Sequence, residues 1–507
     1  MNRYLLVFLL LSSIIPAAEY NILDFGAVGD GKTINTAVVQ QAIDAASLAG
    51  GRVVIPPGVF VSGSLQLKSN VELYLEAGAV LKGSNRVEDY QLEGRKRGLI
   101  FAYEARNITL SGQGIIDGNG TCFFDPNRPH WGPDFDRQYT RQGEKYMDFS
   151  AGIEDGPIAY DDRPGMLVVI LRSEQVTIRD LTFRDSPSWT FRIGDCDGVL
   201  VHGISILNNL LIPNSDGIHC TTSRNVRISD CDIRAGDDCI IVSGFGSEID
   251  EHGDDSRSLL DYPQRTIGNK TGYAENVVVT NCTLQSRSAG VRVGYGQNPI
   301  RNCLFSNLVI YDSNRGLGVF ARDAGSIENI QFENIVIRTR LHTGHWWGAG
   351  EPIHVSAIAQ NKEIPVGAVS NIRFHNIIAE SEAGIVLWGT PQQPLRNIQL
   401  ENINLTIVAG RHTLSYGGNI DLRPTADLKD AVFARDLPGL LAQDIIDARF
   451  ANIQLNWGDG LPPFFTHGIE AVRVKKLRVE DFVGSAAPSA KKAKAIYLQH
   501  CPKAEMD

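Results

Sequence analysis

From about residue 106 almost to the C-terminus, one pattern of apolar and polar positions recurs along the chain. Each unit has a polar turn residue, alternating apolar positions, a break at Asn or Asp and a second short apolar run. Examples are "EQVTIRDLTFRD", "RNVRISDCDIRAGDD" and "IENIQFENIVIRT". Alternation with a period of two is typical of β-strands. The equivalent apolar positions are Val176, Val199, Val226, Val277, Ile330, Ile372 and Ile398.

The spacing of these positions predicts a stacked solenoid. The step is 23 residues from Val176 to Val199, 27 to Val226 and 51 to Val277, which we interpret as one coil plus an insertion. A period in the twenties made only of short strands and turns is typical of coils that cover one another's apolar faces. A β-sandwich also has short strands, but it does not predict so regular a phrase. We therefore predict an all-β protein, a right-handed parallel β-helix.

The N-terminal residues 1–18 have the pattern of a secretory signal peptide. Arg3 supplies a positive charge, an apolar run follows, and Pro16-Ala17-Ala18 resembles a cleavage site. A retained membrane anchor is the alternative, although the apolar run is short for a bilayer span. The expected product is a single β-helix domain over residues 19–507 that is secreted or periplasmic and has no membrane contact once the signal is removed.

A short helix is predicted just after this segment. Asn35 or Thr36 serves as its cap, and Val38, Ala42 and Ala45 share one apolar face. Such a helix would cover the open end of the first coil of the solenoid.

The composition excludes some classes of partner. The net charge is −10, whereas nucleic-acid binding needs a basic face. The eight cysteines mostly lie within apolar runs, which favours small buried side chains over disulfides. There is no C-x-x-C pair or His cluster at ligand spacing, so neither a metal nor another cofactor is expected.

Three aspartates stand out in "PNSDGIHC" and "RAGDDCI". Asp237 follows Asp216 by 21 residues, one short coil, so Asp216, Asp237 and Asp238 should lie together on coils about 4.8 Å apart. Aspartates at such places can be simple turn formers, but clustered carboxylates repel, and the pKa of at least one should rise. A protonated and an ionised carboxyl group side by side are what glycosidic bond hydrolysis uses.

With these motifs, and with "NILDFGAVGDGKTINTAVVQQAIDAA" and "PSWTFRIGDCDGV", the chain resembles glycoside hydrolase family 28, the polygalacturonase family. The resemblance covers nearly all of the chain after the signal. It implies that Asp237 is the general acid and that Asp216 and Asp238 hold and activate water, with Asn214 orienting Asp216. It also implies inversion of configuration, with carboxylates about 6.5–9.5 Å apart.

The sequence departs from this family at two motifs. Members usually have Gly-His-Gly on the next coil, where this chain has Ser288 to Gly290, and then Arg-Ile-Lys, where it has Gly318 to Phe320. Arg292 and Arg322 lie nearby and are candidates to bind a sugar carboxylate, because a guanidinium can do so with two hydrogen bonds. The alternative for each is a surface arginine paired with a carboxylate such as Asp323.

Other stretches are candidates to shape the substrate cleft. The insertion at 245–272 should form a wall beside the aspartates. Trp346 and Trp347 are candidates to stack on sugar rings, although packing under a loop would explain them equally well. The same alternatives apply to His130 and Trp131.

The expected function is therefore a secreted inverting hydrolase of a pectic or related polysaccharide. We expect it to be a monomer whose partner is a polysaccharide or oligosaccharide, and exo-acting, because long insertions can close one end of a cleft. One alternative is a polysaccharide lyase on the same fold, with an Arg or Lys base and bound calcium. Another is a catalytically inactive carbohydrate-binding β-helix, which the missing histidine and lysine favour and the aspartates oppose.

Overall fold

The computed structural model describes residues 18–92, 94–130, 139–146, 154–246, 272–344, 346–423 and 425–507. The predicted signal segment, apart from Ala18, lies outside these residues, as do Trp131 and most of the 245–272 insertion. None of the described helices is both long and apolar enough to cross a membrane.

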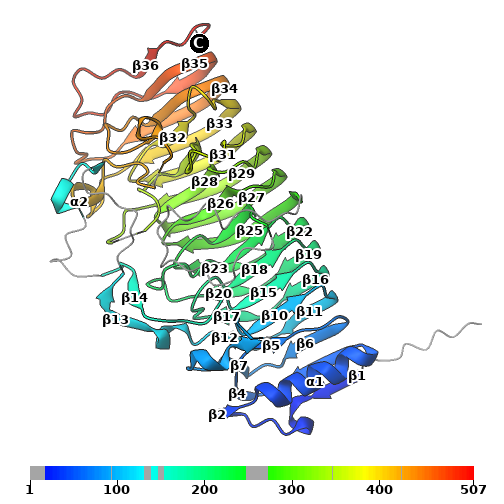
Figure 1. Ribbon diagram of the computed structural model, residues 1–507. Helices are drawn as coiled ribbons and strands as arrows, with labels where there is room; N and C mark the ends of the chain where they lie inside the picture. The colour runs from blue at the N-terminus through cyan, green and yellow to red at the C-terminus, as the bar shows by residue number, and fades with distance from the viewer. Residues whose placement is uncertain are drawn as a thin grey trace, which may run out of the picture.

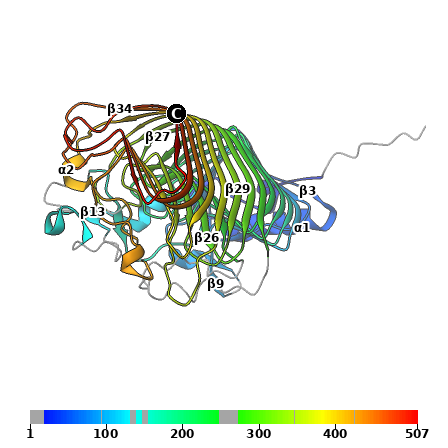
Figure 2. The same cartoon turned by 90° about the horizontal axis from the view of Figure 1, so that it is seen from above.

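The chain winds into coils that stack along one axis, as Figure 1 shows from the side and Figure 2 nearly along it. Neighbouring coils pair in parallel in a single 33-stranded sheet. The predicted all-β parallel β-helix is confirmed. Strands at equivalent places on successive coils form rows that run the length of the molecule.

One row of short strands will prove important for function, and we call it the site row. Its members are β5 (Leu65–Gln66), β10 (Ile100–Tyr103), β15 (Val168–Leu171), β18 (Phe191–Gly194), β21 (Ile218–Thr221), β24 (Ile240–Gly244), β26 (Ala289–Gly296), β28 (Arg315–Ala321), β30 (Ile353–Ala357) and β32 (Ile385–Trp388).

Two further rows complete the early coils. The first contains β1 (Ala18–Asn21), β3 (Gly51–Ile55), β6 (Val71–Leu75), β11 (Arg106–Gly112), β16 (Glu174–Arg179), β19 (Asp197–His202) and β22 (Arg224–Ser229). The second contains β2 (Asp30–Ile34), β4 (Gly58–Ser62), β7 (Ala79–Gly83), β12 (Ile115–Asp117), β17 (Thr182–Arg184), β20 (Ser205–Leu207) and β23 (Asp232–Ala235).

Both rows then merge into long strands, because β22 and β23 pair with the same strand, β25. The long strands are β25 (Ala274–Ser286), β27 (Ile300–Ser313), β29 (Ile327–Thr339), β31 (Val369–Ser381), β33 (Leu395–Ile407), β34 (Leu440–Trp457) and β35 (Ile469–Val483). The stack ends with β36 (Ile496–Gln499) and β37 (Glu505–Met506). Outside the main sheet lie two antiparallel pairs, β8 (Gln91–Leu92) with β9 (Arg95–Lys96) and β13 (Phe124–Pro129) with β14 (Ile158–Tyr160).

The repeat in the sequence sets the register between coils. Val199 pairs with Val176 on one side and with Val226 on the other, and Val226 pairs with Val277 across the insertion. These positions point inward, where they are fully buried in one continuous core. The predicted coil length and equivalent positions are thus confirmed.

The Asn that breaks each repeat has a structural reason. Asn307, Asn334 and Asn376 adopt positive φ angles of 55–57°, which asparagine tolerates better than most residues. Each side-chain amide donates a hydrogen bond to the asparagine one coil earlier, at 3.0–3.4 Å. The recurring asparagines therefore form a ladder that makes the corner of each coil.

Helix α1 (Thr36–Ala49) covers the N-terminal end of the stack, as predicted (Figure 1). The face it buries consists of Val39, Ala42, Ile43 and Ala46, and Val38 packs against the same core while partly buried. The predictions of Ala42 and Val38 are thus confirmed, whereas Ala45 is not part of the buried face. The observed set follows the spacing i, i+3, i+4, i+7 that gives an α-helix one continuous apolar stripe. Asn35 precedes the helix without capping it through its side chain.

Several elements lie outside the coils on one side of the molecule. In both views β13 and the short helix α2 (Thr413–Tyr416) project on the same side (Figures 1 and 2), and β14 pairs with β13. All eight cysteines are free, six of them buried, which confirms that they serve as small buried side chains.

Candidate active site

The three predicted aspartates come together at the start of two neighbouring strands of the site row. Asp216 precedes β21, while Asp237 and Asp238 precede β24, the next strand. One carboxylate oxygen from each residue lies within 4.8 Å of those of the other two. Their exposed fractions are only 2%, 7% and 3%. The predicted proximity is confirmed, and Asp237 is the most accessible of the three.

The separation expected for the carboxylates was wrong. The resemblance implied about 6.5–9.5 Å, whereas the grouped oxygens are within 4.8 Å. The reason is the fold, because residues at equivalent places on adjacent coils are separated by about one strand spacing. The stereochemistry of the reaction therefore needs its own experiment, given below.

Asp238 is paired with Arg292 of β26. The Arg292 Nε atom donates to Asp238 Oδ2, and the backbone N–H of Ala289 donates to Asp238 Oδ1 at 2.9 Å. Burial alone would lower the pKa of Arg292, but the combined attraction of Asp238, Tyr295 and Asp216 outweighs it and raises the pKa. The guanidinium also lies 4.6 Å from the ring centre of Tyr295. Arg292 thus reaches the aspartates as predicted, but its charge is matched by Asp238.

Asp216 has a different environment. Its Oδ1 atom has no hydrogen-bond partner among the described residues, and its Oδ2 lies 3.7 Å from Nδ1 of His219. Burial first, and then the charges of Asp237 and Asp238, raise the pKa of Asp216 well above its usual value. The environment of Asp216 therefore favours the protonated form of its carboxyl group.

His219 is a site residue that the sequence reasoning missed. It is fully buried, its ring centre lies 3.9 Å from that of Trp189, and its Nε2 atom is 3.0 Å from the Ser243 hydroxyl. Burial and then the charge of Arg292 lower its pKa well below the usual value, so the ring is neutral. Its place between the apolar residues Ile218 and Cys220 in "SDGIHC" was a signal that could have revealed it. These two residues point into the core, and successive residues of a strand point to opposite faces, so His219 points away from the core.

Asn214 is not placed as predicted. It has a positive φ of 53°, and the structure shows no hydrogen bond from it to Asp216 within the described part of the chain. Ser215 instead connects the turn before Asp216 with the turn before Asp237 through hydrogen bonds. Its hydroxyl accepts from the Gly236 N–H at 3.0 Å and donates to the carbonyl of Ile212 at 2.8 Å.

The place of the missing Arg-Ile-Lys motif is filled by an aromatic ring. A Cβ atom on Gly318 would lie 2.4 Å from the Phe320 ring. The ring can therefore adopt this position only because residue 318 is a glycine. The guanidinium groups of Arg423 and Arg315 lie 4.0 Å and 4.8 Å from the ring centre. Two arginines thus lie close to the positions at which the Arg-Ile-Lys motif would supply an arginine and a lysine.

Both of these arginines are paired with carboxylates. Arg315 Nε lies 2.5 Å from Glu351, and Arg423 Nε lies 2.8 Å from Asp421. Arg423 comes from the irregular segment between β33 and β34, outside the repeat. Sequence periodicity gave no signal for it.

Arg322 is buried rather than exposed. It is 3% exposed, and its Nε donates to Gln360 Oε1 at 3.4 Å. Burial, and then the charge of Arg423, lower its pKa. Asp323 instead accepts hydrogen bonds from Gln360 and from the backbone of Gly296, so the alternative of a surface arginine does not hold. A role of Arg322 toward a sugar carboxylate stays a prediction.

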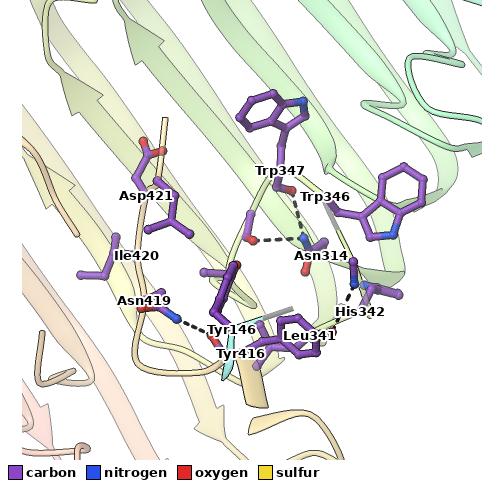
Figure 3. Close-up of a pocket in the computed structure, with 14 residues that line it drawn as sticks. Tyr146, Asn314, Leu341, His342, Trp346, Trp347, Tyr416, Asn419, Ile420 and Asp421 are labelled. Atoms are coloured by element: carbon purple, nitrogen blue, oxygen red, sulfur yellow. Dashed lines mark hydrogen bonds between the residues drawn. The ribbon is translucent and has the colours of Figure 1, made fainter. Parts of the chain in front are cut away.

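The two tryptophans differ. Trp346 is buried, and its indole N–H donates to the carbonyl of Asp155 at 2.8 Å, which fits packing under a loop. Trp347 is partly exposed, and both tryptophans line a pocket together with Tyr416, Asn419 and Asp421 (Figure 3). This pocket does not include Asp216, Asp237 or Asp238.

Among the residues that the structure describes, two groups of side chains are close enough together to be considered for a metal ion. They are the three aspartates and the group of Glu154, Asp155 and His412. In the second, Asp155 already accepts hydrogen bonds from Thr343 and Arg340. In the first, Asp238 is paired with Arg292. Each set thus contains a carboxylate that is already paired with an arginine.

We expect Asp216→Asn to raise the melting temperature at pH 7, with a smaller gain toward pH 4. The folded protein retains a proton on Asp216 that the unfolded chain releases as the pH rises above about 4, so this aspartate costs stability at higher pH. Asparagine has no proton to release. Differential scanning calorimetry across this range, with the half-buried Asp232→Asn as control, tests the expectation. An asparagine variant no more stable than the parent protein at pH 7 would contradict it.

Comparisons with known proteins bear on this site. The model of glycosyl hydrolases family 28 matches residues 46–420. A "Probable polygalacturonase" of Vitis vinifera is 26% identical over 417 residues, which cover 78% of this chain and 75% of the relative. The "Exo-poly-alpha-D-galacturonosidase" of Dickeya chrysanthemi is 28% identical over 334 residues, which cover 57% and 55% of the two chains.

A solved structure with the same fold is the family 28 exopolygalacturonase of Yersinia enterocolitica. It superimposes with a TM-score of 0.62 at 19% identity, covering 97% of this chain and 78% of that one. At this identity the likeness shows the fold.

Proposed function

Because the chain belongs to glycosyl hydrolases family 28, we propose that it is an exported, exo-acting hydrolase that cleaves glycosidic bonds of a pectic polysaccharide with inversion. The observation that carries the proposal is the buried group of Asp216, Asp237 and Asp238. The names of the Dickeya and Yersinia proteins support the exo mode, and the pattern of the first residues supports export.

In the proposed reaction Asp237 donates its proton to the glycosidic oxygen as the bond to the anomeric carbon breaks. It is the most exposed of the three aspartates, as a group that must reach the leaving oxygen should be. A water attacks the anomeric carbon from the opposite face, and its proton passes to Asp216 or Asp238. The open Oδ1 of Asp216 and the unpartnered Nδ1 of His219 supply hydrogen-bonding positions for this water.

Arg292 has a supporting role in this scheme. Its ion pair with Asp238 places a positive charge beside the three carboxylates. The raised pKa of Asp216, caused by burial and then by the charges of Asp237 and Asp238, favours one proton shared between Asp216 and Asp237. Two carboxyl groups in different states of protonation are the arrangement that acid–base catalysis needs.

The test is incubation of the purified protein with a panel of pectic fractions. We expect the release of a single small sugar, identified by chromatography, because an exo-enzyme removes units from one end of the chain. Proton NMR of the first product should show the anomer opposite to that of the substrate. Retention of the anomeric configuration would contradict the inverting scheme, and an unsaturated product would indicate a lyase.

One observation favours a second candidate, a carbohydrate-binding protein without activity. Gly318 and Phe320 replace the arginine and lysine expected at those positions. Binding of pectic fragments without release of any sugar, in the same panel, would support this candidate and contradict the hydrolase.

A further inference from the structure

A pocket lies farther along the site row, beyond the aspartates. Ala289 donates to Asp238 and pairs in register with Arg315 one coil later. Asn314, which precedes Arg315, thus stands two coils beyond Asp237 at the equivalent turn, about 10 Å along the axis. Asn314 lines the pocket together with His342, Trp347, Asn419 and other residues (Figure 3). A short oligosaccharide bound at the aspartates would reach it.

The side-chain amide of Asn314 has a fixed orientation, and its oxygen atom has no hydrogen-bond partner. Its Nδ2 donates to the carbonyl oxygens of Trp347 and Gly348, both at 3.1 Å. A flipped amide would place its oxygen against these two carbonyls. The Oδ1 atom therefore faces away from them, and it has no hydrogen-bond partner although the residue is only 3% exposed. It is an open acceptor.

His342 contributes the opposite kind of group. Its Nε2 lies 2.9 Å from Nη1 of Arg287, and because a guanidinium can only donate, Nε2 must be the acceptor. Burial, aided by the charge of Arg287, lowers the pKa of His342 to about 4, so the ring is neutral and its proton is on Nδ1. This N–H has no partner in the described structure. It is an open donor.

An unpartnered acceptor and an unpartnered donor in one buried place are costly unless a ligand satisfies them. A hydroxyl group both donates and accepts, so it suits this pair. Asp421 is the only charged side chain among the described residues that line the pocket. Its charge is matched by Arg423, so a sugar carboxylate would find no lining cation to pair with, and a buried carboxylate without a partner is costly.

We propose that this pocket is a subsite for an uncharged sugar unit, which Asn314 Oδ1 and His342 Nδ1 bind through a hydroxyl group. The inference rests on the proposed function, because it assumes that the same saccharide chain occupies the aspartate site. It narrows the substrate to a chain that carries a neutral sugar about two coil spacings along the site row from the bond that is cleaved.

The experiment is calorimetric titration of an Asp237→Asn background, in which turnover is blocked. The two probes are tetragalacturonate and its carboxyl-reduced form, which share linkage and ring configuration and differ only in charge. The reduced form should bind more tightly. Adding His342→Gln should weaken its binding roughly fivefold, the size of one neutral hydrogen bond, and leave the acidic probe almost unchanged.

His202→Gln on the exposed face of β19 is the matched control. If His342→Gln does not fold, Leu422→Trp serves instead, because a larger side chain fills the pocket and leaves its polar groups intact. Equal binding of both probes, equal losses for both, or no binding of the reduced probe would overturn the subsite. Absence of sugar release by the parent protein would instead contradict the proposed function, since binding to the Asp237→Asn background requires no turnover.

Discussion

Replacing Asp237 with asparagine is expected to lower the hydrolysis rate by roughly 10²–10⁴-fold, the contribution typical of a general acid, without altering the fold. The side-chain oxygen of asparagine can still accept the 2.8 Å hydrogen bond that the Asp238 N–H donates to Asp237. It has no acidic proton for the leaving oxygen. The rate of release of reducing ends, with circular dichroism to check the fold, measures both parts of the expectation.

Asp232→Asn is the matched control for this variant, because it removes a carboxylate from the start of β23, away from the site row. It should retain full activity. If Asp237→Asn kept a tenth or more of the parent rate on a substrate with a poor leaving group, another residue would have to be the acid.

Replacing Arg292 with methionine is expected to destabilise the protein by about 3–5 kcal/mol, because it leaves the Asp238 carboxylate buried without its partner. Methionine retains much of the arginine's apolar volume, so loss of the ion pair dominates. Denaturant unfolding followed by fluorescence measures the change in the free energy of unfolding. Activity should be lost at the same time, because Asp238 would lose the hydrogen bond from Arg292 that holds its carboxylate in place.

The double variant Arg292→Met with Asp238→Asn separates the two effects. It removes the unpaired charge, so most of the lost stability should return while hydrolysis stays absent. A double variant as unstable as Arg292→Met alone would show that packing around the guanidinium, rather than the charge of Asp238, accounts for the loss.

Much of the active-site geometry follows from the sequence because the fold is periodic. The step from Val199 to Val226 is one coil, and the two residues pair in register. The 21 residues from Asp216 to Asp237 are a shorter coil, so these aspartates lie together. In a β-helix a residue's neighbours on the next coil stand at a nearly fixed sequence separation, so local patterning determines which side chains meet.

The partners that complete the site were decided by tertiary structure alone. Arg423 and Asp421 come from an irregular segment outside the repeat, yet Arg423 lies over the Phe320 ring. His342 likewise meets the pocket from the segment between β29 and β30. Segments of this kind have no register with the coils. Their contacts depend on how each loop packs against the coils and on which of its side chains become buried there. No spacing in the sequence determines this packing.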